Sequence, residues 1–136
     1  MSIENKSYSV LVIDDDEDIL KIVELGLSRI SELNLVTAFA SDGKEGLKLC
    51  KNFKFDAVIT DYFMPNMDGL QFIKEFRESS AIKNIPIIFT SGYFANLKTE
   101  NEDIFEDVIF MEKPFELAKL CSFLKLYLQG AKLAKR

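Results

Sequence analysis

Acidic, hydroxyl and amine side chains follow the apolar segments of this sequence in a regular way. Asp14 and Asp15 come after the first segment, Asp61 after the third, Thr90 closes the fourth and Lys113 follows the fifth. Carboxylates that lie together repel one another and raise each other's pKa unless a cation neutralises them. Because carboxylate oxygens are the ligands that a hard divalent cation prefers, these residues predict a Mg²⁺ site.

The same residues suit phosphoryl transfer, in which positioning and neutralisation of charge do most of the catalysis. An ionised aspartate can itself attack phosphorus and form an aspartyl phosphate, so no separate general base is required. The chain contains no His, which excludes a Ser-His-Asp triad, a histidine-ligated metal and a phosphohistidine of its own. Any such histidine must belong to a partner.

Each of these signals also has a simpler interpretation. The acidic run from Asp14 to Asp18 fits a charged helix N-terminus, Thr90 fits an ordinary strand end, and Lys113 before a proline fits a turn. A calcium loop starting at Asp14 fits poorly, because Ile19 and Leu25 would stand at its glycine and bidentate positions. The joint occurrence of these acidic, hydroxyl and amine residues at successive strand ends favours one shared site.

The elements that must position these residues alternate along the chain. Short apolar runs predict strands at residues 8–13, 35–40, 57–60, 87–90 and 108–111. The expected helices carry the apolar stripes Ile19, Ile22, Val23, Gly26, Leu27 and Ile30; Leu47 and Cys50; Leu70, Ile73 and Phe76; and Leu117, Leu120, Phe123, Leu124, Tyr127 and Leu128. A weaker, acidic helix is expected at 95–105. This alternation predicts a doubly wound α/β fold whose parallel sheet has its site at the carboxyl ends of the strands.

Composition limits the domain organisation and the cellular setting. The 136 residues, 48% of them hydrophobic, suffice for the core of one domain. We expect a flexible N-terminus at 1–7, a folded domain at 8–128 and a short tail at 129–136 that leaves no room for an output domain. No apolar run exceeds four residues, so neither a membrane span nor a secretory segment is expected, and a cytoplasmic location is predicted.

Charge and cysteine content also limit the possible partners and the cellular setting. The formal charge of −5 disfavours binding to nucleic acid, and the basic residues Lys132, Lys135 and Arg136 are interpreted as a solvated tail. Cys50 and Cys121 lie in helical patterns and are predicted to be buried free thiols.

At this point the sequence resembles the receiver domain of two-component response regulators. The stretches that carry the resemblance are 10–15, 57–69, 87–91 and 113–115, and the block Asp-x-x-Met-Pro-x-Met-Asp-Gly from Asp61 to Gly69 is the most specific of them. The resemblance covers about Tyr8 to Leu128. It implies a (βα)5 flavodoxin-like fold with five parallel strands in the order 2-1-3-4-5.

The resemblance also implies roles for the site residues. Asp61 would accept a phosphoryl group from a phosphohistidine on a sensor histidine kinase or a histidine phosphotransfer protein. Asp15, Asp61 and the backbone carbonyl of Phe63 would bind Mg²⁺ directly, and Asp14 largely through water. Thr90 would hydrogen-bond to the phosphoryl group and Lys113 would pair with it. Gly69 would allow a tight entry into the third helix, and a cis peptide bond before Pro114 would aim Lys113 into the site.

Signalling in this family implies a shift between two conformers. Thr90 would move inward and Phe110 would turn into the vacated space, unless Phe110 is simply a core residue. The acidic stretch from Glu100 to Asp107 departs from the family's pattern and leaves the choice of partner open. We expect a monomer or weak dimer that acts by binding another protein or by passing the phosphate onward. Apart from weak Mg²⁺-dependent self-phosphorylation and self-dephosphorylation, it is not expected to be an enzyme.

Two alternatives remain at this stage. The first is an interaction module that uses the fold and is never phosphorylated. The second is a phosphatase similar to the haloacid-dehalogenase type, because Asp14 to Asp16 satisfies that family's Asp-x-Asp start. However, Asp18 stands where that family places Thr or Val, and no acidic pair follows Lys113.

Overall fold

A computed structural model describes residues 6–79, 85–92 and 107–130 of the chain. Its strands are β1 (Ser7–Ile13), β2 (Asn34–Ala40), β3 (Ala57–Asp61), β4 (Ile87–Ser91) and β5 (Val108–Glu112). Its helices are α1 (Glu17–Ser28), α2 (Gly43–Asn52), α3 (Gly69–Ser79) and α5 (Leu117–Leu128). The helix predicted at 95–105 lies outside the described residues.

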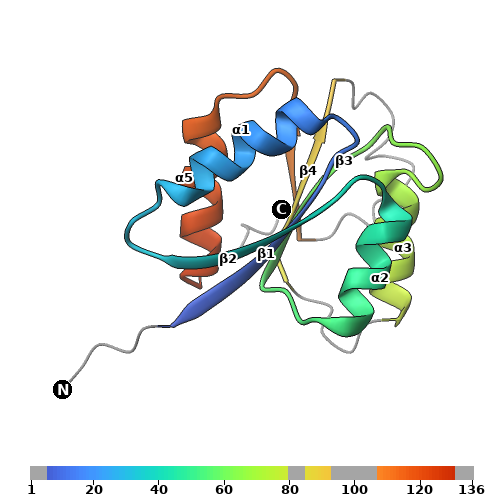
Figure 1. Ribbon diagram of the computed structural model, residues 1–136, viewed down its shortest axis with the longest axis horizontal. Helices are drawn as coiled ribbons and strands as arrows, with labels where there is room; N and C mark the ends of the chain where they lie inside the picture. The colour runs from blue at the N-terminus through green and yellow to red at the C-terminus, as the bar shows by residue number, and fades with distance from the viewer. Residues whose placement is uncertain (1–5, 80–84, 93–106, 131–136) are drawn as a thin grey trace.

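All the described strands belong to one parallel sheet with the order β2-β1-β3-β4-β5. Helices α1 and α5 cover one face of this sheet, and α2 and α3 cover the other (Figure 1). The predicted fold class and strand order are therefore confirmed. In this order the topological switch point lies between β1 and β3, and a crevice opens there at the carboxyl ends of these two strands.

The apolar strands divide their side chains between two clusters, one on each face. Toward α2 and α3 the strands contribute Leu11, Ile13, Val58, Ile87 and Phe89, which pack with Phe72 and Ile73. Toward α1 and α5 they contribute Val10, Val12, Ile59 and Ile88, which pack with Val23, Leu27, Leu120 and Leu124. Central strands that are covered on both faces require continuous apolar sequence, as is observed here.

Capping residues begin the helices that flank the site. The side chain of Asp16 accepts hydrogen bonds from the backbone N–H groups of Asp18 and Ile19 at 2.9 and 3.4 Å. The side chain of Asp42 accepts one from the N–H of Glu45 at 2.8 Å. Part of the acidic run is thus a helix cap, as its simpler interpretation held, and Asp14 and Asp15 lie before the cap.

Two details of the predicted burial are wrong. Ile22 belongs to the predicted apolar stripe of α1 but is 50% exposed. The helix packs closely against α5 one turn later, at Gly26, where an added Cβ would lie 2.7 Å from Leu117. Cys50 and Cys121 are free thiols as predicted, but both are only partly buried. Among the described residues, no helix is long and apolar enough to cross a membrane.

Candidate functional site

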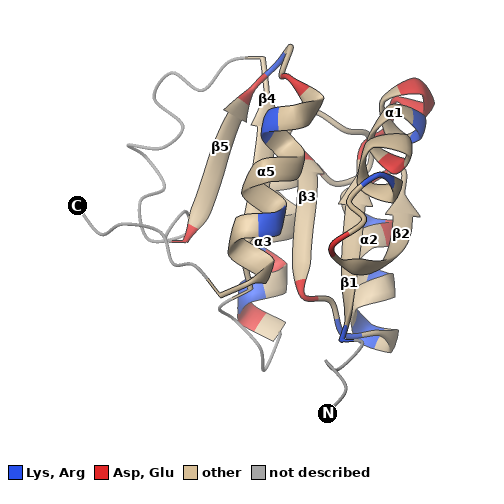
Figure 2. Cartoon of the chain, turned by 90° about the vertical axis from the view of Figure 1, so that its left-hand side faces the viewer, with Lys and Arg blue, Asp and Glu red and all other residues tan. Residues whose placement is uncertain are grey.

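Three carboxylates meet at the carboxyl ends of β1 and β3. Oxygens of Asp14, Asp15 and Asp61 all lie within 4.8 Å of one another. Asp14 and Asp61 are only 3% and 7% exposed, whereas Asp15 is exposed. The strand register brings two of them together. Ile13 of β1 stands opposite Thr60 of β3, so the residues that follow them, Asp14 and Asp61, lie side by side. Figure 2 shows strands that are uncharged along most of their length, with charged residues near their ends.

Lys113 joins this group from the far end of the chain. Its Nζ lies 3.1 Å from Oδ2 of Asp14 and 3.1 Å from Oδ1 of Asp61. The peptide bond between Lys113 and Pro114 is cis, as the resemblance implied. The backbone N–H of Lys113 also donates a 2.7 Å hydrogen bond to the carbonyl of Ser91, which ties the β5 end to the β4 end.

Burial and charge shift the pKa values of this group in a consistent way. Burial and the nearby charge of Asp14 raise the pKa of Asp61, and Lys113 offsets part of that rise. Burial by itself would lower the pKa of Lys113, but its hydrogen bond to Asp14 and the charges of both carboxylates raise it overall. Lys113 is therefore held as a cation, while ionised Asp61 is less stable than it would be in water.

The donor set fits a hard divalent cation. Asp14 already uses both oxygens, one toward Lys113 and the other accepting a 2.9 Å hydrogen bond from the N–H of Asp16. Asp15 forms neither a hydrogen bond nor an ion pair with any other described residue. An exposed carboxylate beside two buried ones supplies the oxygen ligands and open water positions that Mg²⁺ requires.

Close backbone contacts hold the loop that follows Asp61. The N–H of Tyr62 donates to the carbonyl of Thr90 at 3.0 Å, and the N–H of Gly69 donates to the carbonyl of Tyr62 at 2.8 Å. A Cβ at Gly69 would lie 2.1 Å from the carbonyl oxygen of Asp61 and 2.7 Å from Phe89. Gly69 does not have a positive φ. It is required for this close approach, and not for the backbone freedom that the tight helix entry suggested.

Comparison with known proteins agrees with this geometry. A family model for the response regulator receiver domain matches residues 10–125. The chain belongs to this family. It is 30% identical over 124 residues to chemotaxis protein CheY-3 of Vibrio cholerae serotype O1, a match that covers 88% of this chain and 90% of that protein. The phosphatase alternative is therefore not supported, because the family match assigns the acids to a different fold family.

Solved structures of receiver domains have the same fold. The receiver domain of Francisella response regulator 1452 superposes with a TM-score of 0.75 at 28% identity, covering 90% of this chain and 97% of that one. The receiver domain of sensor histidine kinase PA1611 from Pseudomonas aeruginosa PAO1 has a TM-score of 0.78 at 20% identity, covering 92% and 100% of the two chains. That structure has a magnesium ion coordinated in its active-site cleft.

The two predicted switch residues of this receiver domain lie on adjacent strands. Thr90 is 2% exposed, and its Oγ1 donates to the carbonyl of Thr60 at 3.4 Å, a long hydrogen bond. Phe110 is partly buried and packs against Phe89, with ring centroids 5.9 Å apart. Phe63, whose backbone carbonyl is a predicted metal ligand, is 66% exposed.

Sequence reasoning missed the aromatic residues that connect these positions. Tyr62 lies between Phe63 and Phe89, with ring centroids 4.5 and 5.6 Å away, and Phe89 continues the series to Phe110. The series therefore extends from the exposed side of the Asp61 loop to β5. The signal available in the sequence was an aromatic residue directly after Asp61 and another directly before Thr90.

An apolar pocket of about 380 Å³ opens beside Lys113 on the receiver domain. It lies between the first turns of α1 and the loop that leads into α5, and it is lined by Ile19, Ile22, Val23, Lys113, Pro114, Phe115 and Leu117. The exposed side chain of Ile22 therefore belongs to a continuous apolar surface next to the acidic group.

Proposed function

We propose that this receiver domain accepts a phosphoryl group on Asp61 from a phosphohistidine of a sensor histidine kinase or a histidine phosphotransfer protein in the cytoplasm. Its output is then phosphorylation-dependent protein binding or onward transfer of the phosphoryl group. The observation that carries this proposal is the grouping at Asp61, whose carboxylate lies 3.1 Å from Nζ of Lys113 and within 4.8 Å of oxygens from Asp14 and Asp15.

The transfer step follows from the chemistry of the carboxylate. An oxygen of ionised Asp61 attacks phosphorus, the new O–P bond forms, and the P–N bond to the partner's imidazole breaks. The electron pair of that bond returns to the imidazole nitrogen, which takes up a proton from solvent. Lys113 Nζ, now shared between Asp14 and Asp61, would turn to pair with the phosphoryl oxygens and stabilise their charge.

Asp15, Asp61 and the carbonyl of Phe63 would hold Mg²⁺ directly, with Asp14 acting largely through water. When bound there, the ion supplies positive charge beside the acceptor carboxylate. Support comes from the close approach of the three carboxylates and from the magnesium ion in the cleft of the PA1611 receiver domain. The carboxylate of Asp14 is engaged by Lys113 and by the N–H of Asp16, whereas that of Asp15 has no such partner among the described residues, which agrees with this division of roles.

Thr90 and Phe110 would convert phosphorylation into a change of surface. Oγ1 of Thr90 makes only a 3.4 Å hydrogen bond to Thr60, so little is lost when it donates to a phosphoryl oxygen instead. Its movement would free space that Phe110, already partly buried against Phe89, enters by rotation. Phe110 carries no hydroxyl, so its inward rotamer leaves no hydrogen bond unsatisfied.

The first experiment is incubation with acetyl phosphate and Mg²⁺, followed by intact mass measurement and mapping of the labelled residue. We expect one added phosphoryl group on Asp61 and none in Asp61→Asn. The matched control is Asp56→Asn, an exposed aspartate before β3 at the opposite end of the sheet, which should label normally. Absence of label under conditions that modify another receiver domain would favour the non-phosphorylated interaction module.

A second experiment tests whether the donor is a protein. A partner that brings a phosphohistidine to Asp61 would dock next to Lys113 and cover the adjacent apolar pocket, so Ile22→Asp should slow transfer from a phosphorylated histidine protein but leave acetyl phosphate labelling unchanged. Leu126→Asp on α5 is the matched control, because Leu126 is 52% exposed and Ile22 is 50% exposed, but only Ile22 lines the pocket. Equal rates for both variants with the protein donor would contradict this docking surface.

A further inference from the structure

The two edges of the sheet differ in how well they are protected. At one edge, β5 has five residues and is bounded by the charged residues Asp107 and Glu112. At the other edge, β2 has seven residues, and no charge, proline or glycine occurs from Leu33 to Ser41. Natural proteins usually protect an edge strand with lysine, proline, a bulge or a covering segment, because its unpaired backbone groups otherwise pair with another strand. The sequence of β2 contains neither a charged residue nor a proline that would protect its edge.

The outward backbone groups of β2 can be assigned from one hydrogen bond. The carbonyl of Ala40 accepts a 3.0 Å hydrogen bond from the N–H of Asp14, so the backbone groups of Ala40 point toward β1. The N–H and C=O of one strand residue point the same way and alternate along the strand. The N–H and C=O groups of Leu35, Thr37 and Phe39 therefore point away from the sheet, and among the described strands β2 pairs only with β1.

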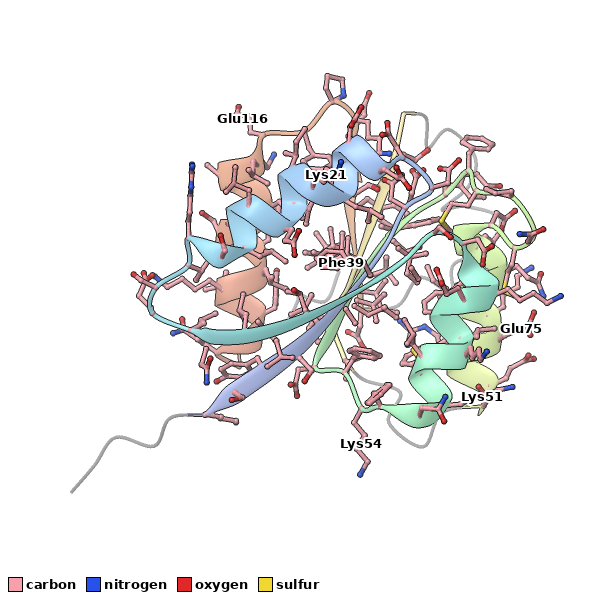
Figure 3. The ribbon with its side chains drawn as sticks, viewed as in Figure 1. Lys21, Phe39, Lys51, Lys54, Glu75 and Glu116 are labelled. Carbon is pink, nitrogen blue, oxygen red and sulfur yellow. The ribbon has the colours of Figure 1, made fainter. Side chains whose placement is uncertain are left out.

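Nothing among the described elements covers this edge. In Figure 1, β2 crosses in front of β1, with α1 on one side and α2 on the other and no element in front of it. Val36 is 56% exposed, and it is among the most exposed large apolar residues of the described chain. Phe39 lies on the α1 side of β2 and packs against the apolar cluster of that face, so core contacts fix the position of β2 (Figure 3).

We propose that β2 pairs in an antiparallel manner with β2 of a second copy of this chain, around a two-fold axis at Thr37. In that register Thr37 stands opposite Thr37 of the second copy, and Leu35 stands opposite Phe39 of the second copy. These are the positions whose N–H and C=O groups point outward, so all of them become paired. The two sheets join into one continuous sheet.

The strand's own sequence argues for a second copy as the occupant. A two-fold axis places each residue opposite a residue of the same strand, so a charge at the axis, or two like charges at equal distances on either side of it, would face each other across the interface. β2 avoids this, because Leu35 faces Phe39, Val36 faces Ala38 and Thr37 faces itself. The net charge of −5 on each copy opposes the pairing, so association should strengthen as salt screens that repulsion.

Sedimentation velocity over a range of protein concentrations and at two salt concentrations tests the proposal. We expect a concentration-dependent dimer in the wild type. The dimer dissociation constant of Thr37→Pro should be about tenfold higher, because proline removes the central outward N–H but leaves the hydrogen bonds to β1 intact. Thr37→Val keeps the N–H and should still dimerise. Far-UV circular dichroism checks the fold, and if the proline variant is unfolded, Thr37→Lys replaces it with like charges at the axis.

Cross-linking gives the register. In a background with Cys50→Ser and Cys121→Ser, Thr37→Cys should form an intermolecular disulfide on oxidation, because residues facing each other across the axis lie within disulfide range. Val36→Cys is more exposed but stands diagonally from its copy, beyond disulfide range, and should cross-link less. A wild type that stays monomeric at high salt, a dimer that survives both Thr37→Pro and Thr37→Lys, or equal cross-linking of the two cysteines would overturn the proposal. None of these results depends on phosphorylation of Asp61.

Discussion

Lys113 is the cation that balances the two buried carboxylates, and its removal tests the electrostatics of the site directly. Its Nζ lies 3.1 Å from both Asp14 and Asp61, whose side chains are only 5% and 9% exposed. Lys113→Met removes the charge and keeps an unbranched side chain of similar length. The variant is left with two buried carboxylates that face each other with no cation between them.

The size of the effect follows from burial. Removing one partner of a fully buried ion pair costs about 3–5 kcal/mol of unfolding free energy. The side chain of Lys113 is 25% exposed, and solvent screening reduces that figure, so we expect a loss of about 2 kcal/mol at pH 7 without divalent cations. Lys125→Met is the matched control. Lys125 pairs with Glu32 at the surface, where the side chains are 36% and 54% exposed, and no measurable loss is expected.

The pH dependence has a definite sign. The pKa of Asp61 is raised, so ionised Asp61 lowers stability at neutral pH, and this cost disappears as pH falls below the group's unfolded value near 3.8. Without Lys113 that cost is larger, so the loss in Lys113→Met should shrink as pH is lowered from 7 to 4. The pKa of Lys113 is raised above 10.5, so its contribution persists below that pH and is lost only as pH rises through the still higher folded value.

Urea unfolding followed by circular dichroism measures these differences, with EDTA present to remove divalent cations. Adding Mg²⁺ should restore much of the loss, and a second substitution, Asp61→Asn, should restore stability without the ion. The reasoning is refuted if Lys113→Met is as stable as the wild type in EDTA, or if it loses the same free energy at pH 4 as at pH 7.

Three further predictions concern the same structure. Gly69→Ala should cost about 1–3 kcal/mol and slow acetyl phosphate labelling, because its Cβ would press on the carbonyl of Asp61; unchanged urea midpoint and labelling rate would contradict this. Mg²⁺ at a hundred times its dissociation constant should add about 2.7 kcal/mol to the unfolding free energy, an increase that Asp15→Asn should lose in urea titrations. Burial raises the pKa of Cys50 to about 11, so iodoacetamide at pH 8 should modify it about a hundredfold more slowly than a free cysteine with the ordinary value of 9.0; equal rates by mass spectrometry would show an accessible thiol.

The sequence by itself determined the order of the described elements and predicted which residues gather at the candidate site. Apolar runs such as Val10 to Ile13 are recognisable because strands covered on both faces need them. Since parallel strands end at a common edge, the polar residues at those ends, including Asp61 and Thr90, were predictable as one group. The matching motif added the cis bond before Pro114 and the strand order, which no local pattern contains.

Tertiary structure alone decided how these residues face one another. Lys113 and Asp14 are 99 positions apart, and their 3.1 Å contact exists only because β5 and β1 end at the same crevice. Ile22 is exposed at the pocket beside Lys113 although it belongs to the apolar stripe of α1, and Gly69 is required because a Cβ there would press on the carbonyl of Asp61. Local periodicity records which face of an element is apolar, but the depth of each contact depends on the partner that packs there, which distant parts of the chain supply.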